Sequence, residues 1–234
     1  MTLIGSKLGY IKRIKISDVK LRLIIRCFCV DCTGLQTSKL ANINRKTVDR
    51  YFNFIRRLVM SDALKERHKL QIENGIEIDE SYFGAKRVRG KRGRGAGRKI
   101  IVLGLLKRQG KVYTGIIPDA KAKSVMPIIR RVVRRGADIY TDGWSSYDAL
   151  AVYGFNHKKV NHEKNEFVKD GVTHVNGIES FWSFAKRRLN KFNGIPKILF
   201  PAYLLESEWR FNQRSDILKK VKKLIKNYQP ILIV

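Results

Sequence analysis

Three acidic residues stand at positions where secondary structure could bring them together. Asp79 lies in the run IEIDESYF, which alternates apolar and polar residues as a strand does, and Asp142 ends the run DIYTD. Glu179 lies at the start of GIESFWSFAKRRL, whose apolar residues recur at helical steps of three and four. The chain has only 20 Asp and Glu residues against 49 Lys and Arg, so acids within ordered segments are conspicuous.

These carboxylates suit the chemistry of phosphodiester bonds. Two divalent ions roughly 3.5–4 Å apart can activate the attacking oxygen and stabilise the leaving oxygen. Because Mg²⁺ and Mn²⁺ prefer hard oxygen ligands, we expect two such ions, with Asp79 bridging them and Asp142 and Glu179 holding one each. Lys186 follows Glu179 by two helical turns and would contact a phosphate or hold Glu179 in place.

The charge of the chain points to a polyanionic partner. Its formal net charge is +29, far more than solubility requires, so nucleic acid is the first candidate and an anionic membrane surface the second. The apolar runs IIVLGLL and ILFPAYLL are too short to cross a bilayer, and the N-terminal residues lack the apolar core of a signal peptide. We therefore expect a cytoplasmic, nucleoid-associated protein that binds double-stranded DNA and no membrane.

Three cysteines, Cys27, Cys29 and Cys32, lie within one short segment. An odd number of cysteines without a secretion signal argues against disulfides. A zinc ribbon needs four ligands, usually in two separated pairs, and the sequence has no second cysteine pair. We predict a reduced, partly buried cluster and no zinc.

Residues 1–74 are predicted to form a helical DNA-binding region. Ser17 is a plausible N-cap for a helix that reaches Cys29, and a short helix through Ala41, a turn at 42–44 and a longer helix from Arg45 follow the helix-turn-helix pattern. An ordinary helical hairpin is the alternative. The side chains expected to face outward, toward bases and phosphates, are Arg45, Lys46, Asp49, Arg50 and Asn53.

Residues 75–214 are predicted to form a catalytic α/β domain, and 215–234 a basic C-terminal helix and tail. Their periodicity gives three strands, a helix, a strand, a helix, a strand and a helix. This is the order of the ribonuclease-H-like fold, a mixed sheet flanked by helices. In such folds an acid on the first strand, one after the fourth and one on a later helix meet at one end of the sheet.

The segment 86–99 is unusually basic. Eight of its 14 residues are Lys or Arg and four are Gly, with no apolar period. We expect a flexible clamp on the DNA backbone, since the segment has charge without a scaffold for reading bases; a solvated loop is the alternative. The cations assigned to this clamp are Lys86, Arg87, Arg89, Lys91, Arg92, Arg94 and Arg98.

Five motifs in order carry a family resemblance. IDESYFG, RGKRGRG, YTDGW, HVNGIESFW followed by AKRRL, and EWRFNQR resemble the ISXO-like group of insertion-sequence DDE transposases, from about Ile76 to Arg214. The resemblance implies Mg²⁺-dependent cutting at transposon ends and attack of the freed 3′-hydroxyl on target DNA. It assigns Asp79, Asp142 and Glu179 as the catalytic acids, with Lys186 as the accompanying cation. We also expect a homo-oligomer in the DNA complex.

Two departures from the family pattern leave alternatives open. Many relatives carry an N-terminal zinc ribbon, which this chain lacks, so recognition of the DNA ends is assigned less directly. Some relatives use Asn as the third catalytic residue, and Asn176 precedes Glu179 by three positions; we prefer Glu179 because a carboxylate binds a hard ion better than an amide. His174 is a candidate accessory residue. A non-catalytic DNA-binding protein or inactivated transposase remnant, and a structure-selective nuclease, are the rival functions.

Overall fold

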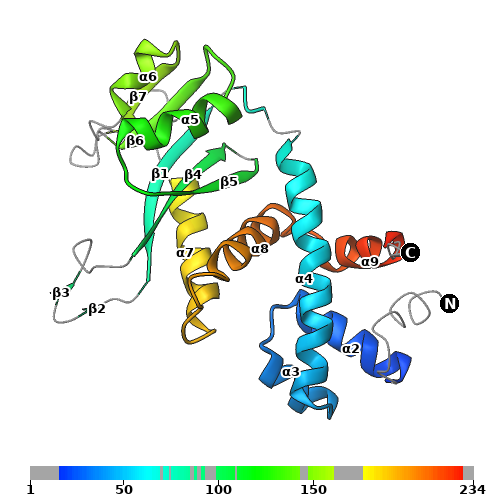
Figure 1. Cartoon of the computed structure of the whole chain (residues 1–234). Helices are drawn as coiled ribbons and strands as arrows, with labels where there is room; N and C mark the ends of the chain where they lie inside the picture. Colours follow the sequence, from blue (N-terminus) through cyan, green and yellow to red (C-terminus); the bar gives the residue numbers. More distant parts are fainter. Residues whose placement is uncertain are drawn as a thin grey trace, which may run out of the picture.

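The chain folds as a mixed α/β structure with a group of helices at one side (Figure 1). The computed structural model describes residues 16–68, 71–73, 75–84, 87–88, 91–92, 99–108, 110–142, 147–160 and 176–228. The helices are α2 (Asp18–Cys29), α3 (Gly34–Ala41), α4 (Arg45–His68), α5 (Ala122–Val132), α6 (Ala149–Val152), α7 (Asn176–Asn190), α8 (Phe200–Asn212) and α9 (Ile217–Asn227). The strands are β1 (Ile76–Phe83), β2 (Arg87–Val88), β3 (Lys91–Arg92), β4 (Ile100–Lys107), β5 (Val112–Ile117), β6 (Asp138–Asp142) and β7 (Asn156–Val160).

A five-stranded mixed sheet has β1 at its centre. The strand order is β5-β4-β1-β6-β7, with β1 antiparallel to β4 and parallel to β6. Asp79 on β1 is paired in register with Gly104 on β4, and Gly104 with Thr114 on β5. The predicted order of strands and helices is confirmed, and the topology is ribonuclease-H-like.

The two faces of the sheet bury different partners, because side chains alternate along each strand. Ile76 and Ile78 point into a core completed by α5 and the residues around α6. On the other face the core residues come from β4, α7 and α8, with Ile178 and Phe181 fully buried. Glu77 and Asp79 point to this second face, so both lie under α7.

The helices outside the sheet share a core of their own. Residues of α2 and α4 pack with Trp209 of α8 and Val221 of α9. Ser17 caps α2 as predicted, its side chain accepting a hydrogen bond from the Lys20 amide, and Asn42 ends α3 in the left-handed conformation with φ 48°. The short helix, turn and long helix are thus present, while their role in binding DNA stays a prediction. In Figure 1, α4 runs from beside α2 and α3 toward the sheet.

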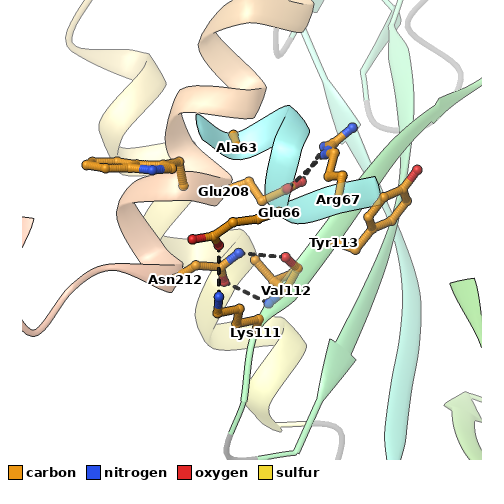
Figure 2. Close-up of a pocket in the computed structure, with 9 residues that line it drawn as sticks. Ala63, Glu66, Arg67, Lys111, Val112, Tyr113, Glu208 and Asn212 are labelled. Carbon is orange, nitrogen blue, oxygen red and sulfur yellow. Dashed lines mark hydrogen bonds and ion pairs between the residues drawn. The ribbon is translucent and has the colours of Figure 1, made fainter. Parts of the chain in front are cut away.

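The motif EWRFNQR at the end of α8 joins this helical group to the sheet. Glu208 accepts hydrogen bonds from the Thr114 amide and hydroxyl, at 2.8 and 2.7 Å, and pairs with Arg67 near the end of α4. Asn212 forms two hydrogen bonds of 2.8 Å with the backbone N–H and C=O of Val112 on β5 (Figure 2). Because β5 is an edge strand, these bonds satisfy backbone groups that would otherwise lack a strand partner.

Helix α5 ends at Val132 because Val133 is extended and bridges Ile72. The segment 86–99, expected to be a flexible clamp, contains the antiparallel ribbon β2–β3, in which Arg87 pairs with Arg92. Helix α6 has only four residues.

Two smaller predictions can be compared with the structure directly. Cys27 and Cys29 are buried and Cys32 partly so, all with free thiols, and burial raises the pKa of Cys29 to about 11. In the part of the chain that the structure describes, no helix combines the length and the apolar character that crossing a bilayer requires.

Candidate active site

Asp79 is held from two sides on the central strand. One carboxyl oxygen accepts the backbone N–H of Glu80 at 2.8 Å, and the other accepts the indole N–H of Trp182 at 3.0 Å. Trp182 lies on α7, three residues after Glu179, so the helix that carries one predicted acid also orients another. Each oxygen of Asp79 keeps a further lone pair for a ligand.

Trp182 reaches Asp79 because the strand beside it carries no side chain at the crossing point. Gly104 is the register partner of Asp79 and points to the same face. A Cβ at Gly104 would lie 2.5 Å from Cζ2 of Trp182 and 2.8 Å from Cδ1 of Ile178. The glycine is therefore required for α7 to approach the sheet this closely.

The three predicted acids share one electrostatic environment. The pKa of Asp79 is raised to about 6, mainly by burial, then by the neighbouring Asp142 carboxylate and to a smaller extent by Glu179. The two hydrogen bonds to Asp79 act in the opposite direction, because they stabilise the charged form. Asp142 is half-buried at the end of β6, and Glu179 is exposed in the first turn of α7.

A fourth acid, Glu80, lies beside this group. Its pKa is raised to about 7, mainly by burial and also by the charges of Asp79 and Asp142, whereas the Tyr147 hydroxyl, a nearby donor, lowers it. Tyr147 is fully buried, and its own pKa is raised by burial and by Glu80. One oxygen each of Glu80 and Asp142, and the Tyr147 hydroxyl, are buried without a hydrogen-bond partner of ordinary geometry.

This donor set fits a hard divalent cation. The carboxylates of Asp79 and Asp142 interact electrostatically, and the unpartnered oxygen of Asp142 is of the ligand type that Mg²⁺ and Mn²⁺ prefer. Glu80 follows Asp79 on the strand and so points to the opposite face of the sheet, where Tyr147 lies. Within the described residues, however, no three His, Cys, Asp or Glu side chains are grouped as an ion would require. Glu179 is the exposed member, so binding requires its side chain to turn inward.

Lys186 lies close to Asp79. Burial and the nearby Lys99 lower the pKa of Lys186, whereas the Asp79 carboxylate raises it, and the ammonium lies 5.9 Å from the centroid of the Phe83 ring. The sequence led us to expect Glu179 as its neighbour, but the charge that acts on it is that of Asp79. The lysine can thus contact a phosphate bound at the acids.

The remaining accessory residues are only partly described. Asn176 is the first residue of α7, and His174 lies outside the described residues. His157 on β7 lies 2.8 Å from the Thr141 hydroxyl through Nε2, one residue before Asp142. It therefore contacts the strand that carries an acid and not the acid itself.

The predicted DNA-contacting residues of α4 fall into two groups. Lys46 and Arg50 are exposed and point outward as expected. Arg45 pairs with Asp49 at 3.5 Å, and Asn53 accepts a hydrogen bond from Arg56 at 2.9 Å.

Asp49 was expected to face outward, and its side chain is 46% exposed. Its carboxylate also lies against Gly34 at the start of α3, where any Cβ would clash with it. Arg45, Asp49 and Asn53 line an open cavity of about 510 Å³ that continues to Lys191 and Tyr203.

The basic clamp can be followed only in part. Arg87 belongs to β2, and Lys91 and Arg92 belong to β3. The other cations of the clamp lie outside the described residues; they are Lys86, Arg89, Arg94 and Arg98.

Sequence reasoning missed three residues at this site. Trp182 stood only among the apolar residues of its helix, and Glu77 and Glu80 were given no role. A buried tryptophan usually finds an acceptor for its N–H, and this was the available signal for Trp182. The signal for the two glutamates was their position close to Asp79 on a strand whose sheet is covered by helices on both faces.

The fold and the acids define a class of protein, a ribonuclease-H-like domain with an acidic centre at the middle of its sheet. Comparison of the sequence with known families agrees with this class and identifies a family within it. Residues 71–212, more than half of the chain, match the ISXO2-like transposase domain. The protein therefore belongs to the ISXO2-like transposase family.

Two curated relatives support the family. An uncharacterized transposase-like protein of Haemophilus influenzae is 44% identical over 119 residues, which cover 50% of this chain and 94% of that protein. An uncharacterized protein in transposable element ISH50 of Halobacterium salinarum is 32% identical over 170 residues, which cover 65% of this chain and 55% of that protein. The chain thus spans only about half the length of the second relative.

Solved structures of the Mos1 transposase show a weak likeness. The paired-end complex with the left transposon end gives a TM-score of 0.28 at 10% identity, covering 93% of this chain and 82% of that one. The paired-end complex with Mn gives a TM-score of 0.26 at 13% identity, covering 94% of this chain and 82% of that one. Likenesses at this level do not bear on mechanism.

Proposed function

We propose that this protein is a transposase that cuts the ends of an insertion sequence and joins the freed 3′-hydroxyl to target DNA. The observation that carries the proposal is the electrostatic grouping of Asp79 with Asp142 and Glu179 on a ribonuclease-H-like sheet. Membership of the ISXO2-like family supports it, and the net charge of +29 supports DNA as the substrate.

The roles of the residues follow from their positions. Asp79, Asp142 and Glu179 would hold Mg²⁺ or Mn²⁺. When bound, such ions supply Lewis-acid activation of the attacking and leaving oxygens. Trp182 keeps one oxygen of Asp79 fixed, so that the other lone pairs keep a constant direction. Lys186 would balance the charge of the phosphate held beside Asp79.

DNA is held, in this proposal, by the helical group and the basic clamp. Lys46 and Arg50 are exposed at the start of α4 and suit contacts with phosphates. The ribbon β2–β3, which follows β1 in the chain, carries Arg87, Lys91 and Arg92 and would contact the DNA backbone. Several copies of the chain would act together on the two ends of the element.

Cleavage and joining are tested with labelled duplexes that carry the ends of the element. Wild-type protein with Mg²⁺ is expected to nick the end and to join it to a plasmid target, and Asp142→Asn is expected to do neither. Asp138→Asn is the matched control, since Asp138 lies on the same strand and pairs with Lys158. Equal activity of wild type and Asp142→Asn would refute the proposed catalytic activity. Nicking without joining would indicate a nuclease of this fold.

DNA binding is tested separately on helix α4. Lys46→Ala and Arg50→Ala are each expected to weaken binding and to reduce the slope of log affinity against log salt by about 1, because each removes one phosphate contact. Lys65→Ala is the control, since Lys65 is exposed near the other end of the same helix. An unchanged salt slope in both variants would exclude this surface.

A further inference from the structure

Glu77 is a buried acid that the mechanism above does not use. It lies on β1 two residues before Asp79, only 4% exposed, beneath the first turn of α7. One carboxyl oxygen accepts the backbone N–H of Ile178 at 2.9 Å, across 101 positions of sequence. The other accepts the Nε–H of Arg108 at 3.3 Å.

The contact with α7 is close and specific. The first amides of a helix lack partners within the helix, and the N-terminus favours negative charge, so a buried carboxylate there satisfies both needs. Gly177 allows the approach, since a Cβ on this residue would lie 2.8 Å from a carboxyl oxygen of Glu77 and would also clash with Leu106. A larger residue at Gly177 would push the helix from the strand.

Two acids of β1 therefore hold α7 at two points. Glu77 binds the amide of Ile178, and Asp79 binds the indole of Trp182, one turn further along the helix. Glu179 lies between these two points. The backbone of Glu179 is consequently placed relative to Asp79 by the same bonds that attach the helix to the strand.

We propose that Glu77 is a positioning residue, which sets the place of Glu179 relative to Asp79 by anchoring the first turn of α7. The inference rests on the proposed function, because it concerns the ion site that these acids would form. Both carboxyl oxygens of Glu77 are already bonded within the fold, so it would act through the helix and not by contact with DNA or ion. A purely structural carboxylate would support folding without affecting ion binding, and this difference can be measured.

The experiment measures binding of Mn²⁺ alone to the full chain, by electron paramagnetic resonance of the free ion, together with thermal unfolding. Glu77→Gln keeps an acceptor for the Ile178 amide but loses the charge that faces Arg108 and the helix N-terminus. Half-saturation is expected to need roughly tenfold to hundredfold more Mn²⁺, the range found when groups that orient ligands are removed. Gly177→Ala is expected to give the same shift with Glu77 intact, because it displaces the helix from the other side.

Glu208→Gln is the matched control. Glu208 is also a buried carboxylate that joins a helix to this sheet, but it contacts Thr114 and Arg67 and none of the acids. Its loss is expected to lower the melting temperature and to leave Mn²⁺ affinity unchanged. Wild-type Mn²⁺ affinity in folded Glu77→Gln and Gly177→Ala would overturn the positioning role alone. Absence of Mn²⁺ binding by the wild type would overturn the proposed ion site, and this inference with it.

Discussion

Trp182 donates its indole N–H to Asp79 at 3.0 Å, so the helix that carries Glu179 also fixes the acid on the central strand. The bond joins residues 103 positions apart and lies at the middle of the sheet. A tryptophan that fills the core thereby acquires a second role at the acidic centre.

Replacement of Trp182 by Phe tests this role. The variant keeps an aromatic ring but leaves one oxygen of Asp79 without its donor, so Mn²⁺ affinity is expected to fall by roughly tenfold to hundredfold. Isothermal titration with Mn²⁺ would measure the change. Trp209→Phe is the control, because Trp209 donates to Asp62 at 2.9 Å in the helical core. The role of Trp182 is refuted if the two variants lose the same affinity.

Gly104 is expected to tolerate no side chain. Alanine there would place a methyl group 2.5 Å from the Trp182 ring, and overpacking of this kind costs roughly 1–3 kcal/mol of unfolding free energy. Gly115→Ala, on the adjacent strand β5, is the comparison, since its Cβ would meet only the terminal Cδ1 of Ile128, at 2.9 Å. Urea unfolding of both variants should show the larger loss for Gly104→Ala, and the reverse order would contradict this packing.

The metal-free protein is expected to lose stability as pH rises from about 4 to 7. In the folded chain the pKa of Asp79 is about 6 and that of Glu80 about 7, against ordinary values of 3.8 and 4.5. Below these ordinary values both carboxyls are protonated in the folded and unfolded states, so neither affects stability. As pH rises, the unfolded chain releases protons that the folded chain retains, and the free energy of unfolding falls by roughly 3 kcal/mol for each carboxyl.

Urea unfolding across this pH range measures the effect. Asp79→Asn and Glu80→Gln should each flatten the fall, since the amide carries no charge to desolvate. Asp138→Asn should not flatten it, because the partner Lys158 lowers the pKa of Asp138. A stability that rises over the same range in the wild type, and not in the two variants, would contradict the burial of these carboxyls.

Asn212 is expected to stabilise the edge of the sheet without affecting the acidic centre. Its amide bonds both backbone groups of Val112, so Asn212→Ala leaves a donor and an acceptor unpaired and should cost on the order of 1–3 kcal/mol. Thermal unfolding would measure the loss, with Asn227→Ala, at the exposed end of α9, as the control. Unchanged stability in Asn212→Ala would show that water replaces the amide.

The order of elements could be predicted because the signals are local. The cap at Ser17, the turn at Asn42 and the apolar stripe of α7 each depend on residues within a few positions, and the structure confirms all three. The motif EWRFNQR was recognised, but its role in joining α8 to the sheet was not, because the residues it contacts lie on β5 and α4.

The missed contacts of the site are long-range. Glu77 and Trp182 act across more than 100 positions of sequence, and no periodicity in one segment indicates what the other presents. The contact of Asp49 with Gly34 was missed for a similar reason. The spacing along α4 carries no information about Gly34, which approaches that face from the preceding helix.

Helix α4 is continuous over 24 residues, or about 36 Å, with Lys46 at one end and Arg67 fastened to β5 and α8 at the other. One full turn of B-DNA has nearly the same length. An insertion of a single residue in the middle of this helix would rotate its first turns by about 100° about the axis relative to the sheet. For the DNA contact proposed for α4, a change of DNA sequence would therefore be met by exchange of its side chains, with the length of the helix kept constant.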